Sequence, residues 1–336
     1  MSRITVYVGL DYHQRGVQVC AMDRDGRILL NKRCVNDWRT IAERVAGLGQ
    51  TIRAAIESCS GAANLAEELV AHAGWSVDLA HPGYVSRMKQ SPDKSDYSDA
   101  RMLADLVRVG YLPRVWLAPE PIRELRLLVR YRQQVVDERR NVKLRIGAVL
   151  REQRVRFDLA HPWTRAWMAW LRETDELSHH GRWVIHRHLN RLAILDQELS
   201  ETEAGLAQAT KDDPLVHRLL SLPGIGPATA WMLRAEIGRF DRFQTGKQLS
   251  RFCGLSPRNA SSGERQADSG LIRAANRQLR AMLIQAGHRL IRHDRRWSEL
   301  GVRLMEAGKP RTVAVAAVTN RWIRWLFHEM QTPVAA

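Results

Sequence analysis

The stretch Ile4-Thr5-Val6-Tyr7-Val8-Gly9-Leu10-Asp11 is a run of β-branched and apolar side chains that ends in a carboxylate. A run of this kind predicts a buried strand. Residues 17–22 alternate in polarity, and the turn-forming sequence Asp-Arg-Asp-Gly separates them from a further strand-like run at residues 27–30, Arg-Ile-Leu-Leu. Three strands joined by short turns predict that the chain opens with an antiparallel meander.

Strand-like and helix-like segments alternate over the next part of the chain. Residues 51–56 and 75–80 are strand-like, whereas apolar side chains recur at helical spacing through residues 41–48, 61–73 and 96–109. Strands that alternate with helices after a meander predict an α/β sheet in which the strand directions are mixed.

The remainder of the chain has the periodicity of helices. Residues 122–155 carry apolar side chains at helical spacing with arginines on the other faces, and residues 183–208 carry leucines at a similar spacing. Two long amphipathic helices in succession predict an antiparallel, coiled-coil-like arm, followed by a mainly helical region. The expected domains are 1–118, an α/β domain; 119–210, the helical arm; and 211–336, a mainly α C-terminal domain.

Positive charge is concentrated in the helical part of the chain. The chain has 52 Lys and Arg against 36 Asp and Glu, a formal net charge of +16. Residues 1–110 hold 14 basic against 13 acidic residues, so a net charge of +15 falls on the other 226 residues. Such a region favours a polyanionic partner, foremost nucleic acid, because neutralised phosphates release counterions. A membrane-surface protein is the alternative, but no helix pairs a broad apolar face with a purely basic one.

The cysteines and the apolar segments argue against several other classes of protein. The cysteines are Cys20, Cys34, Cys59 and Cys253. Their spacing fits neither a disulfide framework nor a zinc site and predicts free thiols in a reducing cytoplasm. No window reaches the ~18 uninterrupted apolar residues of a membrane span, and the carboxylate at Asp11 comes too early for a signal peptide. We therefore expect a cytoplasmic protein without a membrane partner.

Four carboxylates occupy positions that would suit one metal site. Asp11 and Glu57 end two of the expected strands. Asp96 and Asp99 lie three residues apart at the start of an expected helix, and so share one face. Four clustered anions require neutralising cations, and hard oxygen ligands select Mg²⁺ or Mn²⁺, which suit phosphodiester transfer. The alternative is that these are separate surface carboxylates and a helix-capping aspartate.

A Pro-Gly-Ile-Gly turn lies between two helical segments within residues 219–230. Glycines at such a turn let backbone N–H groups approach phosphates at a helix N-terminus. The segment resembles a helix-hairpin-helix, so Gly224, Ile225 and Gly226 are expected to contact nucleic-acid phosphates rather than to read a base sequence. A plain connection between helices is the alternative.

Residues 257–263, Pro-Arg-Asn-Ala-Ser-Ser-Gly, form a polar stretch without periodicity. A serine beside a glycine in a basic loop could act as a nucleophile, with Arg258 and Arg265 binding a phosphate of nucleic acid. Solvated loop residues without a function are the alternative, and the local sequence by itself favours that interpretation.

Five segments form a pattern that extends beyond these single motifs. They are Val8–Asp11, Ile56–Gly61, Lys94–Arg101, Leu222–Ala230 and Phe252–Arg258. In this order they resemble the DEDD transposases of bacterial insertion-sequence family 110 and its subgroup 1111, which are recombinases guided by a bridge RNA. The resemblance covers nearly the whole chain.

The resemblance implies an RNase H-like (RuvC-like) fold for the first domain, with the four carboxylates named above as a metal-binding catalytic tetrad. It implies that the arm contributes to dimerisation and nucleic-acid contact. It also implies a C-terminal transposase domain whose serine attacks DNA. By its position that serine is Ser262, with Ser261 as the alternative.

Together these features predict a transposase, a site-specific DNA recombinase in which a Mg²⁺ (or Mn²⁺) site and a serine nucleophile act together. Its expected partners are donor and target DNA, a bridge RNA and at least one further copy of the chain, at the bacterial nucleoid. One alternative is a RuvC-like structure-specific nuclease without serine chemistry. The other is a basic nucleic-acid-binding protein without catalysis.

Overall fold

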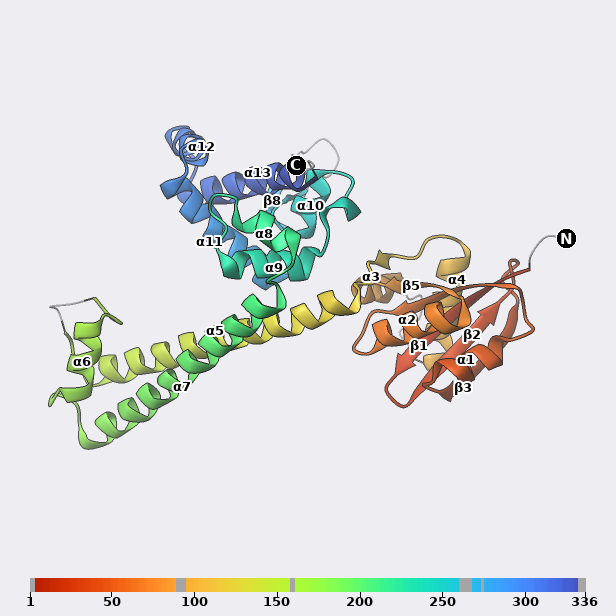
Figure 1. Cartoon of the computed structure of the whole chain (residues 1–336), viewed down its shortest axis with the longest axis horizontal. Helices are drawn as coiled ribbons and strands as arrows, with labels where there is room; N and C mark the ends of the chain where they lie inside the picture. Colours follow the sequence, from red (N-terminus) through yellow and green to blue (C-terminus); the bar gives the residue numbers. More distant parts are fainter. Residues whose placement is uncertain (1–3, 89–94, 158–160, 260–267, 273–274, 332–336) are drawn as a thin grey trace. The chain divides into compact units, whose positions relative to one another are not determined.

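A computed structural model describes residues 4–88, 95–157, 161–259, 268–272 and 275–331. The chain divides into two compact units, Met1–Pro119 and Glu120–Ala336 (Figure 1). In the described residues the first unit is a mixed α/β sheet domain, and the second is helical apart from a two-stranded sheet. These are the fold classes that the sequence predicts. The division of the second unit into an arm and a C-terminal domain stays a prediction.

A six-stranded sheet forms the centre of the first unit, in the order β3-β2-β1-β4-β5-β6. The strands are β1 Thr5–His13, β2 Gly16–Met22, β3 Ile28–Val35, β4 Thr51–Glu57, β5 Ser76–Ala80 and β6 Arg114–Val115. The first three form the expected antiparallel meander, while β1, β4 and β5 run parallel and β6 is antiparallel to β5. The mixed strand directions are therefore confirmed. β6 was not expected, because two residues are too few to show a periodicity.

Helices cover both faces of this sheet. They are α1 Trp38–Val45, α2 Ala62–Ala73, α3 Pro82–Met88 and α4 Asp96–Arg108. Val6, Val8 and Leu10 of β1 pack with α1 and α2. On the opposite face Tyr7 of β1 and Ala55 of β4 pack with α4. Because side chains alternate along a strand, the odd-numbered residues of β1 and β4 face α4.

Two helices begin at or shortly after a proline. α3 begins with Pro82, because proline is well suited to the first position of a helix, where no N–H partner is needed. α6, Arg165–Glu173, follows the sequence His161-Pro162-Trp163. The Thr164 side chain caps it by accepting a hydrogen bond from the N–H of Trp167 at 3.3 Å.

Two long antiparallel helices lie side by side in the second unit (Figure 1). They are α5 Glu120–Glu152 and α7 His179–Ala209. The 33 residues of α5 correspond to a length of about 50 Å at ~1.5 Å per residue. Ile146 of α5 and Ile185 of α7 are fully buried in the seam between them. The predicted pair of amphipathic helices is therefore present, and we refer to α5 and α7 as the arm.

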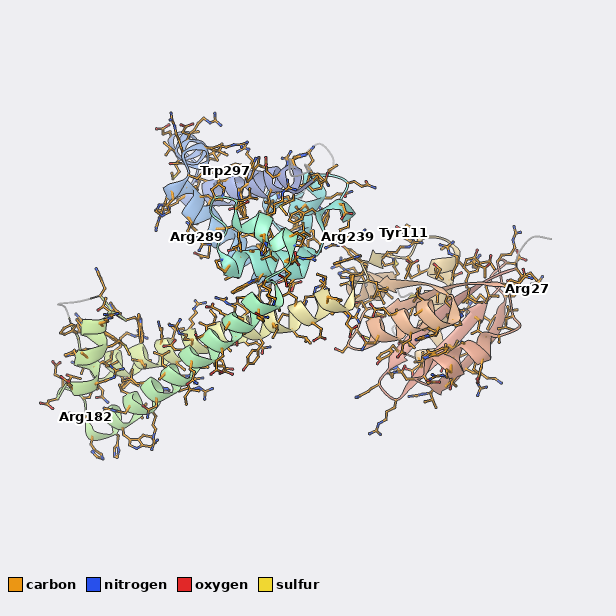
Figure 2. The ribbon with its side chains drawn as sticks, in the orientation of Figure 1. Arg27, Tyr111, Arg182, Arg239, Arg289 and Trp297 are labelled. Carbon is orange, nitrogen blue, oxygen red and sulfur yellow. The ribbon has the colours of Figure 1, made fainter. Side chains whose placement is uncertain are left out.

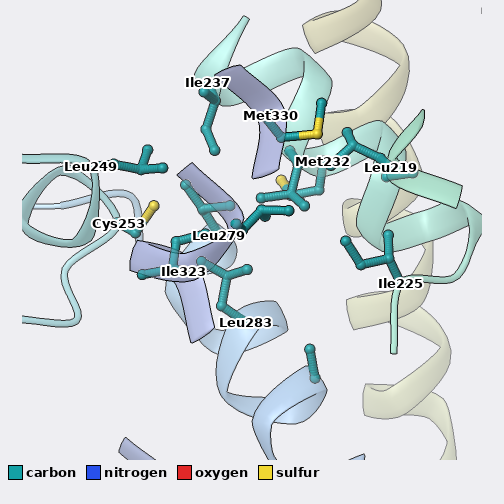
Figure 3. Close-up of a cluster of buried hydrophobic side chains, with 14 of the residues drawn as sticks. Leu219, Ile225, Met232, Ile237, Leu249, Cys253, Leu279, Leu283, Ile323 and Met330 are labelled. Atoms are coloured by element: carbon teal, nitrogen blue, oxygen red, sulfur yellow. The ribbon is translucent and has the colours of Figure 1, made fainter. Parts of the chain in front are cut away.

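The remaining helices surround one hydrophobic core (Figure 3). The elements are α8 Pro214–Leu220, α9 Pro227–Ile237, η1 Phe240–Arg242, α10 Gly246–Phe252, β7 Pro257–Asn259, β8 Asp268–Leu271, α11 Arg277–His293, α12 Arg295–Glu306 and α13 Arg311–Gln331. Met232, Leu283 and Ile323 meet there from α9, α11 and α13. Leu125 and Val129 of α5 belong to the same core, so the base of the arm is packed into it. Among the described helices none is long and apolar enough to cross a membrane.

Candidate active site

β1 and α4 approach each other so closely at Gly9 that no other residue fits there. A Cβ atom at Gly9 would lie 1.9 Å from the carbonyl oxygen of Ala100 and 2.4 Å from the backbone nitrogen of Ala104. Both alanines are fully buried and keep the helix side of this contact small. Small residues on both sides thus let the first turn of α4 lie near the end of β1, where Asp11 is found.

The N-terminus of α4 carries two of the predicted carboxylates. Ser95 caps the helix, and its hydroxyl oxygen accepts a hydrogen bond from the N–H three residues further on at 3.1 Å. Asp96 and Asp99 lie in the first turn, where the helix dipole stabilises negative charge. Asn31 of β3 donates a hydrogen bond to the carbonyl oxygen of Tyr97 at 3.1 Å. This bond ties the first turn of α4 to the sheet.

Asp11, His13 and Asp96 bring their polar atoms together in one cluster. Nε2 of His13 lies 3.2 Å from Oδ2 of Asp11 and 3.4 Å from Oδ1 of Asp96. One ligand atom of each residue lies within 4.8 Å of the other two. Nη1 of Arg33 lies 3.5 Å from Oδ2 of Asp96. The structure therefore joins two of the four predicted carboxylates directly and sets two basic side chains beside them.

His13 was not among the residues predicted for this site. Asp11 and His13 are two residues apart on one strand, so their side chains leave the same face of the sheet. The Asp-x-His spacing at the end of a predicted strand is the signal that could have identified it.

Glu57 ends β4, which is the parallel neighbour of β1. The register pairs Leu10 with Ile56, so Glu57 follows beside Asp11. Ile56 packs with α1 and α2, and alternation along the strand directs Glu57 to the α4 face, as it does Asp11. Burial raises the pKa of the Cys59 thiol, and the negative charges of Glu57 and Asp11 raise it further. Both carboxylates therefore lie within electrostatic range of the same thiol.

The electrostatics of Asp11 show what the cluster requires. Burial raises the pKa of Asp11 above its ordinary value, the nearby imidazole of His13 lowers it, and the carboxylates of Asp96 and Asp99 raise it. The net shift is upward, so the ionised form of this carboxyl is costly in the cluster. Closely spaced carboxylate oxygens are the ligands that a hard divalent cation prefers, and such an ion would relieve the repulsion. The donor set therefore fits a divalent cation.

The predicted phosphate-binding turn connects α8 with α9. Gly224 has a left-handed φ of +82°, and a Cβ atom there would lie 2.5 Å from a methyl carbon of Leu290 on α11. Ile225 is buried, with 6% of its surface exposed, so its side chain belongs to the core. Any contact of this residue with nucleic acid would therefore be made by its backbone. Gly226 caps α9 without a side-chain hydrogen bond, and open space surrounds it. Binding of nucleic acid at this turn stays a prediction.

The predicted serine loop falls largely outside the described part of the chain. Arg258 lies in β7 and is exposed. Ser261, Ser262 and Arg265 lie outside the described residues. The choice of Ser262 or Ser261 as a nucleophile therefore stays a prediction.

Two family models match the chain in succession. Residues 8–154 match the DEDD model of IS110 elements, described as a transposase. Residues 216–301 match the model described as "Transposase IS116/IS110/IS902 family". The first match includes all four predicted carboxylates, and the second includes the Gly224–Gly226 turn.

Similar proteins carry the same description over most of their length. The transposase for insertion sequence element IS1328 of Yersinia enterocolitica is 26% identical, over 85% of this chain and 83% of the relative. The transposase for insertion sequence element IS1111A of Coxiella burnetii is 24% identical, over 95% of this chain and 88% of the relative. The chain thus combines an α/β domain, clustered carboxylates and matches to transposases. These features define it as an enzyme of the transposase class, and transposases transfer DNA strands. The chain belongs to the IS116/IS110/IS902 family of insertion-sequence transposases.

Proposed function

We propose that this transposase is a site-specific DNA recombinase whose first unit has an RNase H-like (RuvC-like) fold. In this proposal Asp11, Glu57, Asp96 and Asp99 bind Mg²⁺, with Mn²⁺ as the other suitable ion. The convergence of Asp11 and Asp96 on His13 is the observation that carries the proposal. Glu57 on the neighbouring parallel strand and Asp99 one turn along α4 lend it further support.

The residues of the cluster have separate tasks in this mechanism. A bound divalent cation supplies Lewis-acid polarisation of the scissile phosphate and lowers the cost of a charged oxygen nucleophile. Asp11 and Glu57 fix its position because rigid neighbouring strands carry them. Asp96 and Asp99 add ligands from α4. Arg33 offsets the charge of Asp96 when no cation is bound, since its Nη1 lies 3.5 Å from Oδ2 of Asp96. Nε2 of His13 lies between the Asp11 and Asp96 carboxylates.

The nucleophile in the proposal is the hydroxyl of Ser262. Its oxygen attacks the phosphorus of the scissile phosphodiester and its proton passes to water. The bond to the 3′-oxygen breaks, and that oxygen takes up a proton from water. A phosphoserine link to DNA results, and a 3′-hydroxyl of the exchanged strand later reverses the step. Serine is almost fully protonated at neutral pH, so this attack depends on activation at the carboxylate site.

The same proposal assigns the partners of the enzyme. Donor and target DNA are the substrates, a bridge RNA is the guide, and at least two copies of the chain act together through the arm. The basic excess after residue 110 supports nucleic-acid partners. The similar proteins come from bacteria, and the proposal has the enzyme act on DNA at the nucleoid in the cytoplasm.

The test of the metal site is the pair of variants Asp96→Asn and Asp105→Asn. Both aspartates lie on α4, but Asp105 is ion-paired with Arg108 and lies two turns beyond the cluster. With guide RNA, donor and target DNA and Mg²⁺, Asp96→Asn should bind nucleic acid normally and break no strands, whereas Asp105→Asn should resemble the wild-type protein. Strand breakage by Asp96→Asn at the wild-type rate would exclude this metal site.

The test of the serine is a covalent protein–DNA adduct that survives denaturation. The wild-type protein should form it and Ser262→Ala should not, while DNA binding is unchanged. Free cleaved ends without an adduct would indicate a RuvC-like nuclease, and binding without breakage would indicate a non-catalytic protein. Full recombination by Ser262→Ala would exclude Ser262 and make Ser261→Ala the next variant.

A further inference from the structure

A wide groove lies within the second unit, between three elements that are distant in sequence. Its walls are α5 of the arm, the turn that begins α9, and α11, and its volume is about 1260 Å³. All the residues that line it belong to the second unit. The carboxylate cluster belongs to the first unit.

Basic side chains dominate the charge of this groove. Arg132 and Arg140 come from α5 and Arg277 and Arg289 come from α11 (Arg289 is labelled in Figure 2), with Asp137 as the carboxylate in the lining. Arg132 is ion-paired with Glu203 at 2.6 Å. The other three arginines are exposed, and none has a carboxylate partner among the described residues. Three positive charges on two facing helices thus remain available for an anionic ligand.

Helix N-termini add further positive potential. α9 and α11 both begin at the groove, which is lined by Gly226 and Asn276, their respective capping residues. Asn276 already accepts hydrogen bonds from the N–H groups of its own helix. Gly226 offers no such side chain. Pro227 has no N–H, and the N–H of Thr229 donates to the carbonyl oxygen of Gly226 at 3.0 Å, which leaves the N–H of Ala228 for a ligand. An uncapped helix N-terminus favours an anion such as phosphate.

The two glycines of the turn have different roles. Gly224 needs its left-handed φ and sits against Leu290, so it serves the packing of the turn on α11. Gly226 has an extended backbone, φ −94° and ψ 173°, and nothing lies within 4 Å of the position that a Cβ atom would take there. An alanine would therefore be compatible with the fold at residue 226. Its methyl group would take up space on the open side of the groove.

We propose that this groove binds the sugar–phosphate backbone of a nucleic-acid strand, an inference that rests on the proposed recombinase function. Arg140, Arg277 and Arg289 contact successive phosphates, and the N-terminus of α9 at Gly226 receives one of them closely. Contacts of this kind position a strand without reading its bases. Because α5 forms one wall, the same strand is bound by the arm and by the C-terminal helices together.

The test is the salt dependence of binding by the full-length protein in EDTA, where no strand is cut. Probes are a labelled DNA duplex and an RNA duplex of the same sequence, over about 50–200 mM salt. Arg140→Gln/Arg277→Gln/Arg289→Gln should weaken binding of at least one probe roughly 10- to 100-fold and reduce the salt slope by about 2.7, or ~0.9 per lost phosphate contact. A loss confined to DNA assigns the groove to the substrate, and a loss confined to RNA assigns it to the guide.

The matched control removes three exposed arginines elsewhere in the same unit, Arg172→Gln/Arg303→Gln/Arg311→Gln. The control variant should change the salt slope and the affinity for the duplex probes much less than the groove variant does. Equal effects of the two triple variants on both probes would overturn the proposal, because charge alone and not the groove would then explain binding. Unfolding midpoints of all variants should match the wild-type protein, since every substituted side chain is exposed.

Gly226→Ala is the second variant, and it changes no charge. It should weaken binding of the same probe at an unchanged unfolding midpoint, because only the approach to the α9 N-terminus is blocked. Wild-type affinity in both Gly226→Ala and the triple groove variant would refute the groove and leave the recombinase proposal intact. A wild-type protein that binds neither duplex would refute both proposals.

Discussion

At the scale of single residues, Gly9 controls how close α4 comes to the carboxylate on β1. Gly9→Ala would push a methyl group into the backbone of Ala100, which is 1.9 Å from the Cβ position. We expect the free energy of unfolding to fall by roughly 1–3 kcal/mol, which is the typical cost of overpacking a buried site. We also expect strand breakage to be lost, because Asp96 would be displaced. Urea denaturation and a cleavage assay measure the two effects.

Gly205 in α7 supplies the control for this substitution. Nothing lies within 4 Å of a Cβ position there, so Gly205→Ala should stabilise the protein by roughly 0.5–1 kcal/mol through helix propensity. If Gly9→Ala raised the unfolding midpoint as Gly205→Ala does, the close packing of β1 on α4 would be refuted.

The raised pKa of Asp11 makes a second prediction at this scale. A carboxyl whose pKa is higher in the folded than in the unfolded state destabilises the fold once it ionises, so stability falls as pH rises from the unfolded value of 3.8 through the folded pKa. Asp11→Asn should therefore raise the unfolding midpoint of the metal-free protein at pH 7, and this gain should vanish toward pH 4. Thermal unfolding in EDTA across that range measures it.

Asp105→Asn is the reference variant for the pH experiment, since Asp105 is half-exposed and paired with Arg108. The difference in unfolding midpoint between Asp105→Asn and the wild-type protein should be the same at pH 4 and at pH 7. A lower midpoint for Asp11→Asn at pH 7 than at pH 4, relative to the wild-type protein, would contradict the direction of the pKa shift.

At the scale of elements, polar contacts fix the base of the arm to the C-terminal helices. Nε of Arg126 on α5 donates a hydrogen bond to the carbonyl oxygen of Ala235 at 2.7 Å. Nε of Arg130 lies 3.2 Å from Oε1 of Glu236, a carboxylate that is buried with 6% of its surface exposed. The arm is therefore anchored at α9 by hydrogen bonds as well as by Leu125 in the core.

Removal of this anchor should be costly. Glu236→Ala removes the buried carboxylate that pairs with Arg130 and should lower the free energy of unfolding by roughly 1.5–3 kcal/mol, the contribution of a hydrogen bond to a charged group. Glu299→Ala breaks the exposed pair with Arg295 on α12 and should change it by no more than about 0.5 kcal/mol. Equal effects of the two substitutions in urea denaturation would show that the anchor adds no stability.

At the scale of the whole molecule, charge separates the two units. Residues 1–119 hold 15 basic and 13 acidic residues, which leaves a net charge of +14 on residues 120–336. The carboxylate cluster thus lies in the nearly neutral unit, and the groove lies in the basic one. We expect the first unit to contribute chemistry and the second to contribute most of the affinity for nucleic acid.

A fragment of residues 1–119 tests this expectation, because the unit has its own sheet and its own core. It should bind a DNA duplex at least about 100-fold more weakly than the full chain at low salt, and with a much shallower salt dependence. Fluorescence anisotropy titrations at several salt concentrations measure both quantities. Binding by the fragment as tight as binding by the full chain would refute the charge argument.

The sequence alone was sufficient for most of the elements and for proposing the candidate carboxylates, although it did not predict β6 or α3. Apolar alternation predicted the meander of β1 to β3, and helical spacing predicted both helices of the arm, because local periodicity records which face of each element is buried. Asp11 and Glu57 were recognisable because each ends a strand-like run. The serine assignment and the bridge RNA depend on family resemblance, and no local physical signal in the sequence supports them.

Only the tertiary structure showed which of these residues meet. His13 joins Asp11 and Asp96 because β1 lies under α4 at Gly9, a contact between segments about 90 residues apart that local periodicity does not encode. The groove likewise combines arginines of α5 and α11 with the turn at Gly226. A sequence pattern specifies which side of a helix or strand is buried, whereas the packing of distant elements decides which charges share one site.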